Sequence, residues 1–146
     1  MEKEILITKI ILPVIPIAKG RPRFTKKGFA YTPGKTRNAE KEIKHYLIKQ
    51  LGTGFKPLQG ALRLVLFFYL LKPRSTKNTW PTSRPDLDNY VKLVKDAMNE
   101  IVYLDDSQVI WLEAKKLYSN ETYIKALIYE INNETAIDIK KFKGDK

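Results

Sequence analysis

The residues best suited to chemistry lie between positions 84 and 108. Asp86 and Asp88 form an Asp-x-Asp pair, Lys92 lies four residues after Asp88, and the pair Asp105-Asp106 closes the segment. A hard cation such as Mg²⁺ takes oxygen ligands and keeps several waters, so two or three carboxylates suffice for a site that must also bind a phosphate group. The segment therefore predicts a cation site that acts on phosphate.

Each of these residues also has an ordinary structural explanation. Asp86 could be a helix N-cap, Asp88 a first-turn acid favoured by the helix dipole, and Asp105-Asp106 a turn. Asp86 and Asp88 can share an ion only if Asp86 lies outside the helix, because two positions inside a helix diverge by about 200°. Pro85 favours that arrangement. A metal site is favoured because these features share 21 residues of a strongly basic protein.

The charge of the chain indicates a polyanionic partner. Its 146 residues include 27 Lys and Arg against 16 Asp and Glu, a net charge of +11. Between Ile5 and Pro85 there are 17 bases and only two acids, whereas residues 86–106 hold six acids and two bases. Such a distribution favours nucleic acid over a membrane as the partner. It also predicts a small acidic region within a basic surface.

Two absences narrow the range of function. The chain has no cysteine, which excludes disulfides and thiolate chemistry. Its longest apolar run, Leu64 to Leu71, is far shorter than the roughly 18 residues that cross a bilayer, and its first residues lack the features of a secretory signal. We therefore expect a soluble, cytoplasmic, DNA-associated protein without a membrane partner.

Basic residues gather in two segments that we expect to bind DNA. They are Lys19, Arg21, Arg23, Lys26 and Lys27 in the first segment, and Lys72, Arg74, Lys77 and Arg84 in the second. Aromatic residues interleave with them, and Phe24, Phe29 or Trp80 could stack on unpaired bases or act as local packing anchors.

The hydrophobic pattern predicts one domain over residues 1–146. A helix over 88–101 is the clearest element, because Val91, Val94 and Met98 share one face while Asp88 and Lys92 share the opposite face. The other expected elements are an edge strand within 4–17, a basic hairpin turning at 27–28, a helix from Thr36 or Asn38 to Leu51, a strand buried on both faces over 61–71, a loop over 72–84, an antiparallel hairpin of strands 109–118 and 122–131, and a frayed tail over 138–146. The expected fold is α/β or α+β, with two helices packed on a mixed sheet of about four strands.

At this point the chain resembles a known family. Arg84 to Ala97 with Asp105-Asp106-Ser-Gln is similar to the signature of RusA-family Holliday-junction resolvases. Lys19 to Thr25 with Tyr31-Thr-Pro resembles the basic motif of the family's phage and prophage members. The resemblance implies a small homodimeric enzyme of DNA recombination and repair that cuts branched DNA, namely four-way junctions, by paired symmetric nicks with Mg²⁺ or Mn²⁺.

The resemblance also implies residue roles. Asp86, Asp88 and Asp106 would be the metal-binding carboxylates and Lys92 the catalytic lysine, while Asn89, Asp96 and Asp105 would orient them. The bound ions would polarise the phosphate and help to generate hydroxide from water, and Lys92 would neutralise charge on the phosphorane or the leaving oxygen. Two nicks related by a twofold axis need two sites, which favours a dimer.

Two alternatives stay open on the sequence alone. Asp86 with Glu113 and Lys115 superficially fits the Pro-Asp…Glu-x-Lys pattern of restriction-type nucleases, although a helix directly after Asp86 is unusual there. The protein could also be a non-catalytic nucleic-acid-binding module whose acids serve only as caps and turns.

Overall fold

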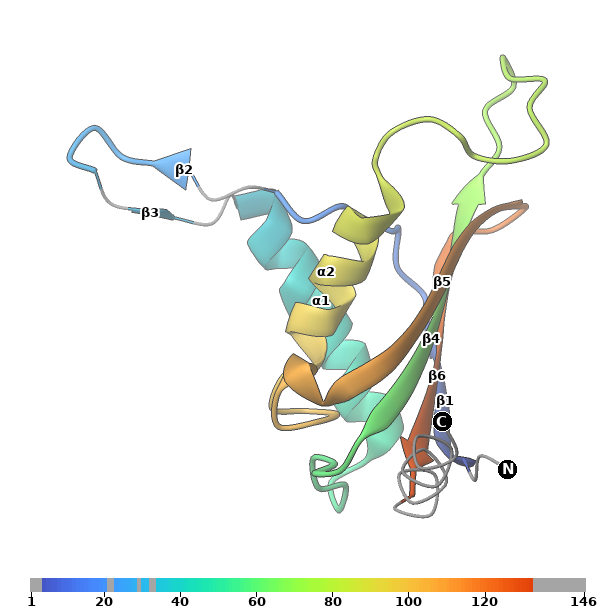
Figure 1. Ribbon diagram of the computed structural model, residues 1–146. Helices are drawn as coiled ribbons and strands as arrows, with labels where there is room; N and C mark the ends of the chain where they lie inside the picture. The colour runs from blue at the N-terminus through green and yellow to red at the C-terminus, as the bar shows by residue number, and fades with distance from the viewer. Residues whose placement is uncertain (1–3, 21–22, 29, 32–33, 133–146) are drawn as a thin grey trace, which may run out of the picture.

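The computed structural model describes residues 4–20, 23–28, 30–31 and 34–132, without the side chains of residues 23, 24, 30 and 31. A four-stranded mixed sheet carries two helices on one face, so the predicted α+β class is confirmed (Figure 1). Arg21, Phe29, the side chains of Arg23 and Phe24, and the tail over 138–146 lie outside the described part of the chain. No helix in that part is long and apolar enough to cross a membrane.

The sheet is built around one central apolar strand. Its strands are β1 (Glu4–Leu12), β4 (Leu62–Leu71), β5 (Val109–Ser119) and β6 (Tyr123–Ile131), in the order β1-β6-β4-β5. β4 runs antiparallel to β6 and parallel to β5. Its nearly continuous apolar sequence fits this central position. β1 is an edge strand, as predicted for the stretch 4–17, and it ends before Pro13.

The predicted hairpin of β5 and β6 is wrong. The two strands follow each other closely and run in opposite directions, but β4 lies between them and pairs with both. Strands two places apart in a sheet are about 10 Å from each other, a distance that three extended residues can span. The short connection over residues 120–122 therefore crosses the end of β4 instead of closing a two-stranded turn.

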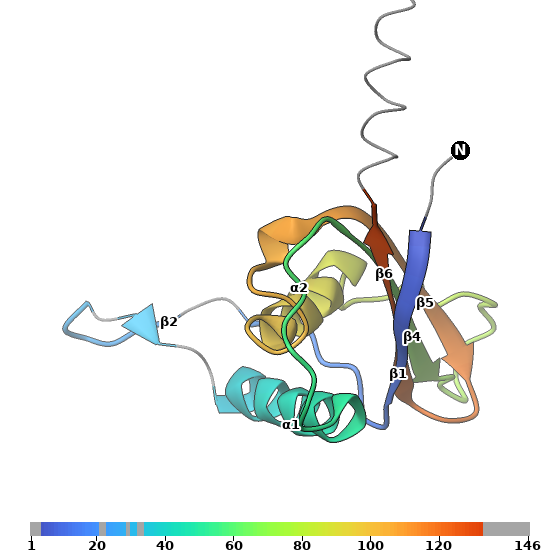
Figure 2. The same cartoon turned by 90° about the horizontal axis from the view of Figure 1, so that it is seen from below.

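Both helices cover the same face of the sheet (Figures 1 and 2). α1 (Gly34–Leu51) buries Ile43 and Leu47, and α2 (Leu87–Met98) buries its apolar stripe. They pack on alternate residues of β4, including Leu64 and Phe68. α2 ends three residues earlier than predicted, and Glu100, at φ 67°, adopts the left-handed conformation just beyond it.

A basic hairpin extends away from this body (Figures 1 and 2). It is formed by β2 (Arg23–Phe24) and β3 (Ala30–Tyr31). The turn is closed by a hydrogen bond from the Gly28 amide to the Thr25 carbonyl at 2.9 Å, and Gly28 has a φ of 87°. Glycine adopts this conformation without a steric penalty, so the predicted turn at Lys27-Gly28 is confirmed.

Candidate active site

The start of α2 presents an aspartate whose side chain is not used to cap the helix. Asp86 is the N-cap residue, with extended backbone (φ −68°, ψ 145°), and its carboxylate makes no capping hydrogen bond. Together with Arg84, Pro85 and Asn89 it lines an open hollow of about 610 Å³. Asp86 thus lies outside the helix, which is the condition under which it could share an ion with Asp88.

The loop before α2 is held by the edge strand of the sheet. The Lys116 ammonium on β5 donates to the carbonyl oxygens of Ser83 and Pro85, each at 2.9 Å. The rings of Tyr90 and Phe68 stack with centroids 5.3 Å apart and fix the first turn of α2 to β4. The position of Asp86 therefore depends on both strands beneath it.

Asp88 and Lys92 lie on the exposed side of α2. Both are exposed, and they are separated by four residues, so they are neighbours on the helix surface. The opposite side carries Val91 and Val94, which are buried in the core. The predicted division of this helix into a core face and a polar face is confirmed.

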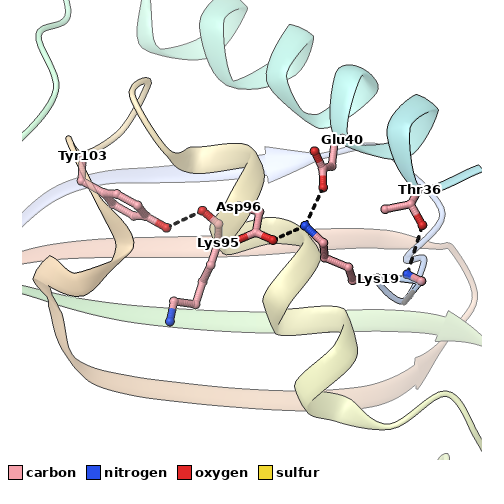
Figure 3. A network of polar contacts seen from close by, with 7 residues as sticks. Lys19, Thr36, Glu40, Lys95, Asp96 and Tyr103 are labelled. Carbon is pink, nitrogen blue, oxygen red and sulfur yellow. Dashed lines mark hydrogen bonds and ion pairs between the residues drawn. The ribbon is translucent and has the colours of Figure 1, made fainter. Parts of the chain in front are cut away.

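Asp96 lies further along α2 and is part of an ion-pair cluster (Figure 3). The Lys19 ammonium bonds to its carboxylate and, at 3.1 Å, to Glu40 of α1. Burial alone would lower the pKa of Lys19, but the hydrogen bonds and charges of these two carboxylates outweigh it and raise that pKa. Lys19 also donates its backbone amide to the Asn89 carbonyl at 3.0 Å. We had expected Lys19 to contact DNA; here its charge joins the two helices.

Asp105 and Asp106 belong to a short 3₁₀ turn after α2. Asp105 accepts the Ser107 amide at 3.0 Å, while Gln108 accepts the Asp105 amide at 2.9 Å, which completes a capping box around the turn Asp106–Gln108. The hydrogen bonds from Ser107 lower the pKa of Asp105. Gln108 also donates to the Leu58 carbonyl at 2.8 Å. Asp105 is therefore occupied in shaping the turn that carries Asp106.

Asp106 lies at the far end of α2 from Asp86. Tyr103 is buried and donates to the Lys95 carbonyl in the last turn of α2 at 2.8 Å. Burial raises the pKa of Tyr103, and the charges of Asp106, Asp96 and Asp105 raise it further. Asp106 begins the turn that follows α2 and therefore lies beyond this end of the helix. The twelve residues of α2 extend about 18 Å. Accordingly, among the described residues no three Asp, Glu or His side chains lie close enough to hold a metal.

Comparison with known proteins now identifies the family. Residues 13–129 match the family described as Endodeoxyribonuclease RusA. The chain belongs to the RusA endodeoxyribonuclease family. It is 32% identical over 133 residues to the uncharacterized protein YqaN of Bacillus subtilis (strain 168), covering 80% of this chain and 92% of YqaN. It is 46% identical over 68 residues to the crossover junction endodeoxyribonuclease rusA of Lactococcus phage r1t, covering 46% of this chain and 52% of that protein.

Several basic residues of this RusA-family chain are free to meet DNA. Lys26 and Lys27 are exposed at the tip of the hairpin. In the loop before α2 the exposed bases are Lys72, Arg74, Lys77 and Arg84. Trp80, 52% exposed, lies in the same loop, and the Lys115 ammonium is 5.0 Å from the centroid of its ring. The part of Trp80 left exposed is available for stacking.

The face of the sheet without helices carries residues that sequence reasoning missed. Arg63 on β4 bonds to Glu4 and Glu113, each at 2.8 Å, and its guanidinium lies over the rings of Trp111 and Tyr129. Glu113 thus faces Arg63 on the side of the sheet opposite α2, apart from Asp86. Its partner is 50 positions away in sequence, and no local pattern points to such a pair.

Proposed function

We propose that this RusA-family endodeoxyribonuclease cleaves four-way DNA junctions by divalent-metal-dependent hydrolysis centred on the first two turns of α2. The observation that carries the proposal is the exposure of Asp86 directly before that helix, and of Asp88 and Lys92 on its surface, in a protein of net charge +11. The phage relative named as a crossover junction endodeoxyribonuclease supports the choice of substrate.

The residues at the start of α2 suit Mg²⁺ or Mn²⁺. The Asp86 and Asp88 carboxylates are both exposed, and neither is occupied by a helix cap. A hard divalent ion takes such oxygen ligands and completes its shell with water and phosphate oxygens. When bound, it supplies Lewis-acid polarisation of the phosphate and lowers the pKa of a coordinated water. Asp106 is the third proposed ligand, and because it lies at the other end of α2, it would come from the second copy of a dimer. Asn89, which also lines the hollow, would orient the ligands.

Lys92 supplies positive charge next to these acids. It lies one turn beyond Asp88, and its ammonium extends from the exposed side of the helix. In the proposed reaction it neutralises negative charge that accumulates on the phosphate oxygens during in-line attack. Arg84, which also lines the hollow, would hold a neighbouring phosphate.

The exposed bases of the hairpin and of the loop over 72–84 would grip DNA on both sides of this site. Their contacts are with phosphates, so they position the substrate without reading its sequence. A dimer would present two such sites to the two strands that must be nicked.

Cleavage of a labelled four-way junction tests the proposal directly. We expect Mg²⁺-dependent paired nicks from the wild type, and loss of cleavage with retained binding in Asp86→Asn, Asp88→Asn and Lys92→Met. Glu42→Gln is the matched control, because it removes one exposed acid from α1, away from the site. If the wild type binds the junction but leaves it intact with Mg²⁺ and with Mn²⁺, the catalytic assignment is wrong and the protein is a binding module.

The restriction-type alternative makes a different prediction. It requires Glu113 and Lys115 for cleavage, so Glu113→Gln would abolish nicking while Asp106→Asn would not. Because Glu113 bonds to Arg63 on the opposite face of the sheet, we expect Glu113→Gln to cleave at the wild-type rate.

A further inference from the structure

A second hollow lies beside the one that Asp86 lines. It has a volume of about 530 Å³ and lies between the carboxyl ends of β4 and β5 and the loop over 72–84, which arches above the sheet (Figure 1). Arg84 lines both hollows. The two are therefore adjacent, and a group held in the second hollow lies next to a phosphate held in the first.

The lining of the second hollow combines apolar side chains with hydroxyls. Leu70 and Tyr118, neighbours in the register of β4 and β5, line it together with Ile15 from the segment after β1. The loop adds serine and threonine hydroxyls, including that of Ser75. Among the described residues that line it, Arg84 alone is charged. Apolar walls with a few hydroxyls suit a flat, neutral heterocycle, because each hydroxyl can both donate and accept a hydrogen bond.

Tyr90 brings to this hollow a buried hydroxyl that no described residue bonds. The side chain is 4% exposed, its ring stacks on Phe68, and it lines the hollow. The hydroxyl makes no hydrogen bond within the described part of the chain, and its oxygen is not fully enclosed by protein atoms. Burial raises the pKa of Tyr90, so the hydroxyl stays protonated and can donate. Buried tyrosine hydroxyls usually have a hydrogen-bond partner, and a ligand with an acceptor on its edge would supply one.

The loop that forms one wall of the second hollow is anchored to the body of the protein. The Lys116 ammonium holds the carbonyl oxygens of Ser83 and Pro85. Pro81 of the same loop is buried. A wall that is already fixed loses little conformational freedom when a ligand binds, so more of the contact energy remains as affinity.

We propose that the second hollow binds one nucleobase of the junction, unstacked from its strand beside the scissile phosphate, and that the Tyr90 hydroxyl donates to an acceptor on the edge of this base. The inference rests on the proposed function for the identity of the substrate. Arg84, at the boundary of the two hollows, bonds to the adjoining phosphate, so the neutral base and its anionic backbone each meet matching chemistry. Unstacking costs least for a base whose pairing or stacking is already interrupted, as it is where strands exchange between the arms of a junction.

Junction binding in EDTA tests this pocket without cleavage. Tyr90→Phe keeps the ring on Phe68 and removes only the hydroxyl, so we expect about a fivefold loss of affinity for the intact junction. A series of junctions carries one abasic nucleotide at a time on either side of the exchange point. At one position the wild type should lose about tenfold in affinity, and Tyr90→Phe should then bind as the wild type does. The pocket is overturned if Tyr90→Phe loses nothing, or if it loses the same factor on every junction in the series.

Filling the hollow is the second test. Ser75→Phe places a ring in it from the exposed loop and should weaken junction binding about tenfold while leaving binding to linear duplex unchanged. The matched control is Thr82→Phe, because Thr82 is exposed in the same loop and does not line the hollow. Wild-type affinity of Ser75→Phe for the junction would overturn the pocket. A wild type that shows the Tyr90 coupling but never nicks with Mg²⁺ refutes the proposed function and keeps the pocket, whereas nicking without the coupling refutes only the pocket.

Discussion

The ion-pair cluster at Lys19 predicts that Lys19→Met destabilises the protein without weakening its hold on DNA. Methionine keeps the length of the side chain but leaves Asp96 and Glu40 without their cation. Hydrogen bonds to charged groups contribute about 1.5–3 kcal/mol each, whereas fully exposed ion pairs contribute about 0.2–1 kcal/mol. The side chains here are 21% and 22% exposed, between these limits, so we expect a loss of about 2 kcal/mol. For a chain of this size that loss lowers Tm by about 4–8 °C.

Urea denaturation and salt-dependent junction binding measure the two halves of this prediction. The urea midpoint of Lys19→Met should fall while the slope of the unfolding free energy against urea stays the same. The control Lys41→Met, which removes an exposed charge from α1, should have the wild-type midpoint. The dependence of log K on log salt should be the same for Lys19→Met as for the wild type. The reasoning is refuted if stability is unchanged and the salt slope drops by about 0.9, because Lys19 would then contact a phosphate.

Two further predictions follow from the buried tyrosine and the basic loop. Burial raises the pKa of Tyr103 in the folded protein. The stability that the neutral Tyr103 side chain contributes is therefore complete below the pH near 10 at which a free tyrosine ionises, and it is lost as the pH rises through the pKa of the folded protein. Tyr103→Phe should flatten the alkaline fall of stability in urea titrations between pH 9 and 11, and an unchanged pH profile would contradict this. Lys72→Met and Lys77→Met each remove an exposed base from the loop before α2. Each should reduce the slope of log K for junction binding against log salt by about 0.9. Fluorescence anisotropy at several salt concentrations measures this slope, and an unaltered slope would show that the loop does not contact phosphates.

Local sequence patterns predicted which segments form helices and strands better than they predicted which strands pair with each other. The apolar run of β4 and the two faces of α2 are short-range signals, and the strand and the helix were both confirmed. The expected burial of β4 on both faces was only partly right, because Phe67 and Tyr69 are half-buried on the face without helices. The predicted pairing of β5 with β6 was wrong, because a short connection between two strands indicates only that their ends are close in space. Which strand lies between β5 and β6 depends on the hydrogen bonds that β4 makes with neighbours along both of its edges. No local sequence pattern indicates those bonds.

The same limit applies to the candidate site. The exposure of Asp88 and Lys92 follows from helical periodicity, and Pro85 favours a place outside the helix for Asp86, so both could be predicted. The partner of Lys19 could not, because Asp96 is 77 positions away and both residues also suit a role at a DNA-binding surface. The position of Asp106 relative to Asp86 could not be predicted from their closeness in sequence, because a helix of twelve residues moves the chain about 18 Å.

The proposed combination of Asp86 and Asp88 from one copy with Asp106 from the other has a consequence for how the enzyme would act. In the proposed arrangement a lone chain carries Asp86 and Asp88 without the third carboxylate, so it could bind DNA through its basic loop and hairpin but not cut it. The twofold axis that completes one site completes the other at the same moment, and the two sites then face the junction with the same symmetry as the paired strands. Cutting activity should therefore rise with the square of protein concentration below the dimer dissociation constant, while binding by the basic segments rises only linearly.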